Sequence, residues 1–226
     1  MFLAVRSNSD PDGKPRTPTF IEEARRRQIV DIGIHLIATQ GYSQATLARI
    51  AQEAGISKGV ISYHFEGKLE LVQEILSRLL REPAEFIKER VDACERATDK
   101  LRAYVTANFE FMKTHRHHYV ALVDLWESRG SSEGDNRFGA EAYAPSRAYL
   151  ARILDTGRDS GEFRRLPSAT MASVIQASID GLMLQWVFDE QAVDLDASRD
   201  ALLEMISRHV AHAARPEGTE TPRRQA

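Results

Sequence analysis

The segment from Thr46 to Phe65 constrains the fold of this chain most, because it predicts two short helices joined by a tight turn. Thr46 is of a residue type that caps a helix N-terminus through its side-chain oxygen. The apolar residues that follow at helical spacing are Leu47, Ile50, Ala51 and Ala54. Gly55 comes where a helix commonly ends in left-handed backbone, and Ser57 is a second capping residue that predicts a new helix at once.

The outer face of the second helix would carry hydrogen-bond donors, one aromatic ring and one residue without a side chain. These residues are Lys58, Gly59, Ser62, Tyr63 and His64. A helix-turn-helix lays such a face in the major groove of DNA. An ordinary pair of packed helices has the same two elements, so the hairpin alone leaves both interpretations open.

The residues on either side of this segment favour DNA binding. Gly41-Tyr42 precedes it and Lys68 follows it. From Arg27 to Leu71 the chain resembles the DNA-binding domain of TetR-family transcriptional regulators. The family pattern is Gly-aromatic, Thr-x-x-x-Ile-Ala, Ala-Gly-Val/Ile-Ser-x-Gly, aromatics ending in Phe, and then Lys. Three positions that depart from it are Ser62, His64 and Gly67. The family often has Tyr at the first two and a capping Ser or Asn at the third.

The resemblance implies an all-α fold, with an N-terminal helix-turn-helix DNA-binding domain of three helices and a C-terminal helical domain for ligand binding and dimerisation. We expect Pro83 to interrupt the helix that begins near Lys68, because proline removes a helical N–H group and clashes with the preceding turn, and we place the domain boundary there. The expected parts are a disordered arm (1–19), the DNA-binding domain (20–67), a linking helix (68–83), the ligand-binding and dimerisation domain (84–214) and a disordered tail (215–226).

The DNA-binding residues should divide between base reading and phosphate contact. Residues expected at base edges or in the groove are Lys58, Ser62 and Tyr63. Residues expected at phosphates are Thr46, His64 and Lys68. Ser57 begins the recognition helix, and Gly59 would let it approach the DNA closely. The basic run Arg25–Arg27 would either contact phosphates as well or form a solvated turn.

The second half of the chain is rich in aromatic residues, and small-molecule sites are mainly apolar with a few polar groups. The expected ligand-binding residues are Asn108, Phe111, Met112, Trp126, Tyr143 and Trp186. Further polar candidates are Glu110, Asp124, Glu127 and Gln185. The effector itself cannot be named from these residues.

The last two helices, at about Met171–Trp186 and Leu202–Val210, are strongly apolar. Beside the apolar stripe of the first lie small residues that let two backbones come close, namely Ala172, Ala177, Ser178 and Gly181. Such a pair could complete the core of a monomer. The resemblance implies instead that they pair with their twofold mates in a homodimer that binds a palindromic operator.

Composition bounds the remaining possibilities. The net charge of −3 excludes a generally basic nucleic-acid coat but allows a local basic patch. Cys94 is the only cysteine, so no intramolecular disulfide can form and a cytoplasmic protein is expected. We expect no membrane span, because no apolar run approaches the required length.

An enzyme is the less favoured interpretation, because no phosphate loop, nucleophile elbow or zinc motif is present. One cluster, His115, His117 and His118 with Asp124 nearby, keeps open a helical metal-dependent enzyme. An architectural DNA-binding protein without a ligand is the other alternative. The favoured hypothesis is a ligand-responsive transcriptional regulator, a repressor released from its operator by a small molecule and needing no cofactor.

Overall fold

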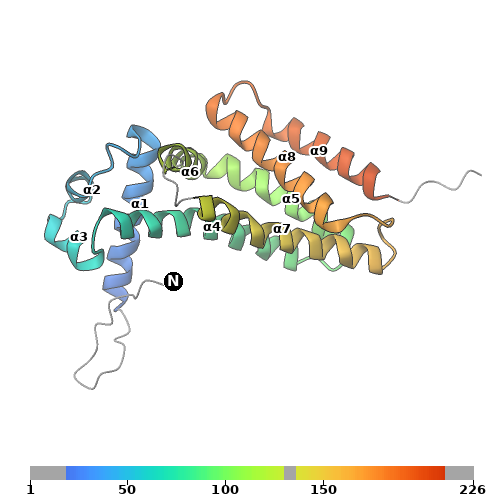
Figure 1. The fold of residues 1–226 in the computed structure, drawn as a ribbon, viewed down its shortest axis with the longest axis horizontal. Coiled ribbons are helices and arrows are strands. Elements are labelled where there is room, and N and C mark those ends of the chain that lie inside the picture. Colours follow the sequence, from blue (N-terminus) through green and yellow to red (C-terminus); the bar gives the residue numbers. More distant parts are fainter. Residues whose placement is uncertain (1–18, 130–135, 212–226) are drawn as a thin grey trace, which may run out of the picture. The chain divides into compact units, whose positions relative to one another are not determined.

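A computed structural model describes residues 19–129 and 136–211, and all regular structure in these ranges is helical (Figure 1). The expected all-α fold is therefore confirmed. The expected arm (1–19) and tail (215–226) lie outside the described residues except for Thr19. The helices are α1 (Phe20–Gln40), α2 (Leu47–Glu53), α3 (Lys58–His64), α4 (Lys68–Asp92), α5 (Ala97–Thr114), α6 (Arg116–Arg129), α7 (Asn136–Asp159), α8 (Ser168–Phe188) and α9 (Leu195–Val210).

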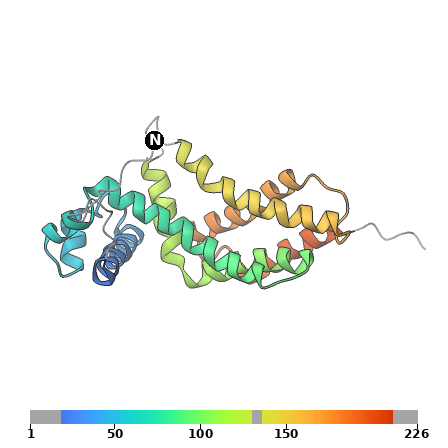
Figure 2. The same ribbon diagram turned by 90° about the horizontal axis from the view of Figure 1, so that it is seen from below.

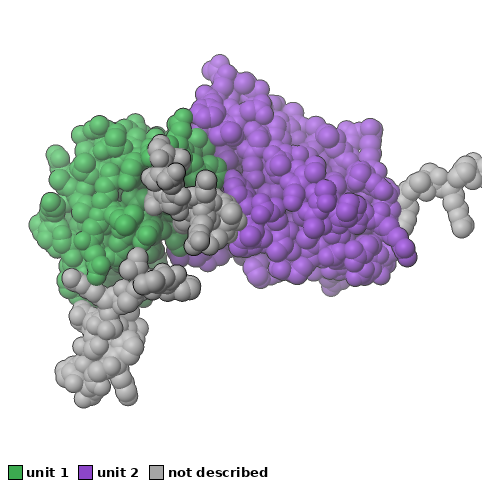
Figure 3. Space-filling model, viewed as in Figure 1, with its two compact units in different colours: residues 1–79, 120–128 green, residues 80–119, 129–226 purple. Residues whose placement is uncertain are grey.

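The chain divides into two compact units (Figure 3). The first contains residues 1–79 together with 120–128, and the second contains residues 80–119 and 129–226. The helices α4 and α6 each contribute residues to both units. The finer division into a DNA-binding domain, a linking helix and a ligand-binding domain stays a prediction.

The expected break at Pro83 is wrong, because α4 continues through this proline to Asp92. An apolar stripe of α4 is buried on both sides of it, with Leu79 before and Ile87 and Val91 after. A proline inside a helix costs about 3 kcal/mol, and tertiary packing of an apolar face supplies most of a helix's stability. Packing on both sides therefore outweighs the local signal.

The first three helices begin and end largely where their local residues predict. Thr46 caps α2 by accepting a hydrogen bond from the Arg49 N–H at 3.2 Å. Gly55 ends the turn with a φ of 63°, in the left-handed region that glycine tolerates. Ser57 stands at the N-cap position of α3, but its side chain makes no capping hydrogen bond.

The second unit contains α5, α7, α8 and α9, arranged as a helical bundle, together with the last part of α4 and a few residues of α6 (Figure 2). Helix α7 packs against α5 and α8, and α9 packs against the same two helices. The buried side chains between them are mainly aliphatic and include Val105, Leu150, Leu154, Ile175 and Ile206. This core places α5, α7 and α8 side by side, which matters for the polar residues described below.

The premise that no apolar run is long enough to span a membrane is wrong, since α8 passes by length and composition alone, although this does not make it a membrane span. The sequence pattern missed it because Gln176, Asp180 and Gln185 interrupt the apolar residues. An ionisable residue inside a bilayer is costly and rare, so Asp180 argues for a helix that packs against protein.

Candidate DNA interface and ligand site

The residues expected to read DNA lie on the accessible face of α3. Lys58, Gly59, Ser62 and Tyr63 are exposed, as are Thr46 and Ser57. His64 and Lys68 are half-buried. The structure thus brings the base-reading candidates onto one short helix, and their contacts with DNA stay predictions.

Gly59 is not required by the packing of the protein itself. A Cβ atom at this position would meet only the Ser57 Oγ, at an ordinary 3.6 Å. The lack of a side chain therefore leaves a smooth surface on the exposed side of α3, which is what a close approach to DNA needs.

Arg26 makes contacts within the protein that neither expected role, phosphate contact or a solvated turn, includes. Its guanidinium donates a hydrogen bond to the His64 carbonyl at 2.6 Å and lies 4.2 Å from the centre of the Phe65 ring. It also forms ion pairs with Glu70 and Glu74 of α4, at 3.4 and 3.2 Å. Arg26 therefore satisfies an end carbonyl of α3 and joins α1, α3 and α4.

Replacing Arg26 by methionine should lower the free energy of unfolding by about 1.5–3 kcal/mol, the usual contribution of a hydrogen bond to a charged group. The ion pairs with Glu70 and Glu74 add little to this free energy, because they are partly exposed. Thermal unfolding measures the change. Arg25→Met is the matched control, since the Arg25 side chain bonds only to the exposed Gln28 among the hydrogen bonds of the described residues. Equal losses in both variants would contradict this role for Arg26.

Lys68 and Asp124 hold the loop after α1 in place. The Lys68 Nζ donates to the Tyr42 carbonyl at 3.0 Å and lies 4.0 Å from the centre of the Tyr42 ring. Burial lowers the pKa of Lys68. The Tyr42 N–H donates to the Asp124 Oδ2 at 2.6 Å. Asp124 thus belongs to the first unit as a loop anchor rather than to a ligand site, and Lys68 already has an internal contact.

The histidine cluster does not form a metal site in the part of the chain that the structure describes. No group of three His, Cys, Asp or Glu residues there could hold a metal ion. His118 lies 2.6 Å from the Glu82 carboxylate, whereas His115 stacks on the Phe111 ring with centroids 3.9 Å apart. His115 and His118 therefore pack between α4, α5 and α6, whereas His117 is exposed.

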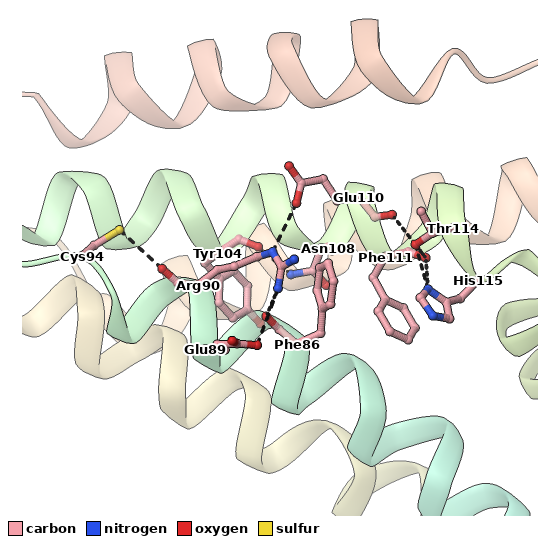
Figure 4. A network of polar contacts seen from close by, with 10 residues as sticks. All are labelled: Phe86, Glu89, Arg90, Cys94, Tyr104, Asn108, Glu110, Phe111, Thr114 and His115. Carbon is pink, nitrogen blue, oxygen red and sulfur yellow. Dashed lines mark hydrogen bonds and ion pairs between the residues drawn. The ribbon is translucent and has the colours of Figure 1, made fainter.

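The six expected ligand-binding residues are only partly brought together. Asn108, Phe111, Met112 and Trp186 are buried, and Tyr143 is half-buried. The Asn108 amide donates to the Tyr104 carbonyl at 2.8 Å (Figure 4). Trp126 belongs to the first unit, whereas the other five belong to the second. Glu110 is occupied by an ion pair with Arg90 at 3.4 Å.

A chain of hydrogen bonds inside the second unit leads to a carboxylate. The Tyr104 hydroxyl on α5 donates to the Gln176 Oε1 at 2.6 Å, and the Gln176 amide donates to the Asp180 Oδ1 at 2.8 Å, both on α8. Burial raises the pKa of Asp180 to about 6, although the bond from Gln176 and the positive charge of Arg147 oppose this rise. Asp180 is therefore a carboxylate whose charge is only partly compensated.

Tyrosines from three helices lie close enough for the charge of this carboxylate to act on them. Burial raises the pKa values of Tyr104, Tyr119 and Tyr143, and the negative charge of Asp180 raises each of them further. A fourth tyrosine, Tyr149, has its ring centroid 6.3 Å from that of Tyr104. The second unit thus combines several aromatic rings with one half-buried negative charge.

Sequence reasoning missed Gln176 and Asp180 as site residues. A signal was present, because two polar residues four positions apart share one face of an otherwise apolar helix. The apolar residues Ile175 and Ile179 beside them made the helix appear entirely apolar in the sequence pattern. Only the packing of α8 against α5 and α7 shows that this polar pair points inward.

The fold and these sites define a helix-turn-helix DNA-binding protein with a helical ligand domain. The family model described as "Bacterial regulatory proteins, tetR family" matches residues 29–75, and that of the "BetI-type transcriptional repressor, C-terminal" matches residues 97–213. The chain belongs to the TetR family of bacterial transcriptional regulators, with a C-terminal domain of the BetI type.

Known relatives agree with this assignment. The chain is 30% identical over 206 residues to the HTH-type transcriptional regulator BetI of Cronobacter sakazakii, covering 88% of this chain and 98% of the relative. A regulator from Saccharomonospora viridis, solved in complex with choline, has the same fold, with a TM-score of 0.75 and 24% identity. The match covers 84% of this chain and 100% of that regulator. FadR from Bacillus subtilis, solved with stearoyl-CoA, is 25% identical, with a TM-score of 0.69. The match covers 81% of this chain and 98% of FadR.

These similarities make the protein a ligand-responsive, DNA-binding transcriptional repressor. They support neither of the two alternatives, the metal-dependent enzyme or the architectural DNA-binding protein without a ligand.

Proposed function

We propose that this protein is a homodimeric repressor that leaves a palindromic operator when a small organic cation binds beside Asp180. The half-buried Asp180 carboxylate, whose negative charge acts on three nearby tyrosines, carries this proposal. The protein would act in the cytoplasm, on operator DNA held by α3 of each protomer. Lys58, Ser62 and Tyr63 would read bases, while Thr46, His64 and Lys68 would hold phosphates.

The charge and the rings favour a cation over the other ligand chemistry seen in similar structures. A carboxylate removed from water is costly unless a positive charge accompanies it. Aromatic faces attract ammonium groups, most strongly when these lose their water. Choline carries a permanent positive charge, whereas stearoyl-CoA is an anion that the half-buried carboxylate of Asp180 would repel. The environment of Asp180 therefore supports a ligand of the choline type.

The dimer would form through α8 and α9, as the sequence predicts. In the protomer α8 leaves Val174, Leu184 and Phe188 exposed, and α9 leaves Met205 exposed to 69%. A soluble protein rarely leaves such apolar side chains together without a partner. Gly181 lies in the same stretch of α8, and a Cβ atom there would meet nothing within 4 Å in the protomer. A second copy could therefore approach this stretch closely.

Asp180→Asn should weaken choline binding about tenfold or more, which corresponds to roughly 1.4 kcal/mol. The affinity of the wild type should rise as the pH increases from about 5 to 7, because the pKa of Asp180 is about 6 and only its charged form attracts a cation. In Asp180→Asn this pH dependence should be absent. Calorimetric titration of the full-length protein with choline measures both effects.

Three comparisons make this test specific. Asp155→Asn removes an exposed carboxylate of the same unit and should leave choline binding unchanged. The neutral isostere 3,3-dimethylbutan-1-ol has choline's shape without its charge and should bind much more weakly. Stearoyl-CoA should bind worse than choline. A preference for the isostere or for stearoyl-CoA would show that the effector is apolar or anionic and that Asp180 is not its partner.

A further inference from the structure

One carboxylate links the beginning of α1 to the exposed face of α3. The Glu22 Oε2 accepts a hydrogen bond from the Thr19 N–H at 2.7 Å, while the Glu22 N–H donates to the Thr19 Oγ1 at 3.3 Å. This reciprocal pair is a capping box at the start of α1. The other carboxylate oxygen, Oε1, accepts a hydrogen bond from the Tyr63 hydroxyl at 2.6 Å.

The bond from Tyr63 is unusual for an exposed side chain. Tyr63 is 59% exposed on the face of α3 that is expected to enter the groove. Its hydroxyl donates to a charged acceptor across 41 positions of the sequence, and a bond of this kind is stronger than one between neutral groups. Because the ring also meets His64 edge to face, with centroids 5.1 Å apart, two contacts restrict its orientation.

A fixed orientation matters for reading DNA. A side chain that is already held in its binding orientation loses less conformational freedom when the complex forms. A base contact also discriminates between bases only when the donor or ring sits at a defined place in the groove. The acceptor that holds the Tyr63 hydroxyl therefore influences which base pair this ring can accept.

We propose that Glu22 is a positioning residue for sequence reading, which holds Tyr63 so that its ring meets one base pair of the operator. This inference rests on the proposed placement of α3 in the major groove. The capping box gives Glu22 a second, purely structural role through Thr19. A useful experiment must separate these two roles.

The chain offers variants that do so. Glu22→Ala removes both roles, Tyr63→Phe removes only the hydroxyl, and Thr19→Ala weakens only the cap. Glu22→Gln retains a hydrogen-bonding side chain for both partners, because glutamine serves in a capping box and the phenol oxygen can accept from the amide. Full-length wild-type protein first selects its preferred duplex from random DNA. Affinities are then measured at one salt concentration for that duplex and for every single-base-pair variant of it.

Glu22→Ala and Tyr63→Phe should each reduce discrimination by about tenfold at the same base pair, and the double variant should lose no more than either alone. Thr19→Ala should lower the melting temperature and weaken binding to all duplexes alike, with the base preference retained. Glu22→Gln should also retain the preference.

Two results would overturn the inference. One is an unchanged base preference in Glu22→Ala together with a lost preference in Tyr63→Phe, since Glu22 would then only cap α1. The other is an unchanged preference in both variants, since Tyr63 would then read no base. If the wild type selected no duplex at all, the result would contradict the placement of α3 in the major groove and, with it, this inference.

Discussion

An arginine at position 181 is expected to convert the dimer into a monomer and to remove tight operator binding at the same time. A Cβ atom at this position would meet nothing within 4 Å in the protomer, so the isolated chain should still fold. In the proposed interface the arginine would instead place a charge between two apolar helices, which is costly without a partner. Linking two DNA-binding modules strengthens binding by about 10²–10⁴-fold, so the monomer should lose affinity on that scale.

Light scattering and an operator-binding assay on the same preparation test this expectation. Ala148→Arg places the same residue on the exposed surface of α7 and serves as the control, which should remain dimeric and bind DNA. A Gly181→Arg protein that folds, stays dimeric and binds the operator would show that the interface lies elsewhere. Circular dichroism distinguishes this result from simple misfolding.

Gly157→Ala is expected to destabilise the second unit strongly. An added Cβ atom would lie 2.1 Å from the Phe163 ring, which is buried in the turn after α7 and is only 2% exposed. The same turn is tied back by a hydrogen bond from the Phe163 N–H to the Gly157 carbonyl at 2.9 Å. Overpacking of a buried ring costs about 1–3 kcal/mol, which exceeds the gain of roughly 1 kcal/mol from replacing a helical glycine by alanine.

Thermal unfolding of the full-length protein measures this loss, and about 2–4 °C per kcal/mol is expected for a chain of this size. Gly59→Ala is the matched control, because its Cβ atom has only an ordinary contact and α3 should tolerate alanine. Melting temperatures that stay equal for the two variants would mean that the Phe163 ring moves aside without cost.

The parts of this fold that depend on neighbouring residues could be predicted from the sequence. Thr46 caps α2 and Gly55 takes a positive φ, because both roles are decided within one helical turn. Such local signals placed the helix-turn-helix, and the pattern around it identified the family. The exposed face of α3 followed from helical periodicity alone.

The features that were missed depend on residues far away in the sequence. Arg26 could not be assigned from the basic run around it, because its acceptor is the carbonyl of His64, 38 positions later. Pro83 was expected to end a helix, but buried residues on both sides of it keep α4 continuous. Asp180 could not be identified as a site from the sequence, because its surroundings depend on the packing of α8 against α5 and α7.

Release of the operator by choline tests directly whether a small organic cation is the effector. The wild-type dimer is bound to its selected duplex, and choline or 3,3-dimethylbutan-1-ol is titrated in while the bound fraction is followed by fluorescence anisotropy. We expect choline to dissociate the complex in the concentration range of its calorimetric affinity and the isostere to leave the complex intact. A complex that persists when choline saturates the protein, or that both compounds dissociate equally, would contradict this expectation.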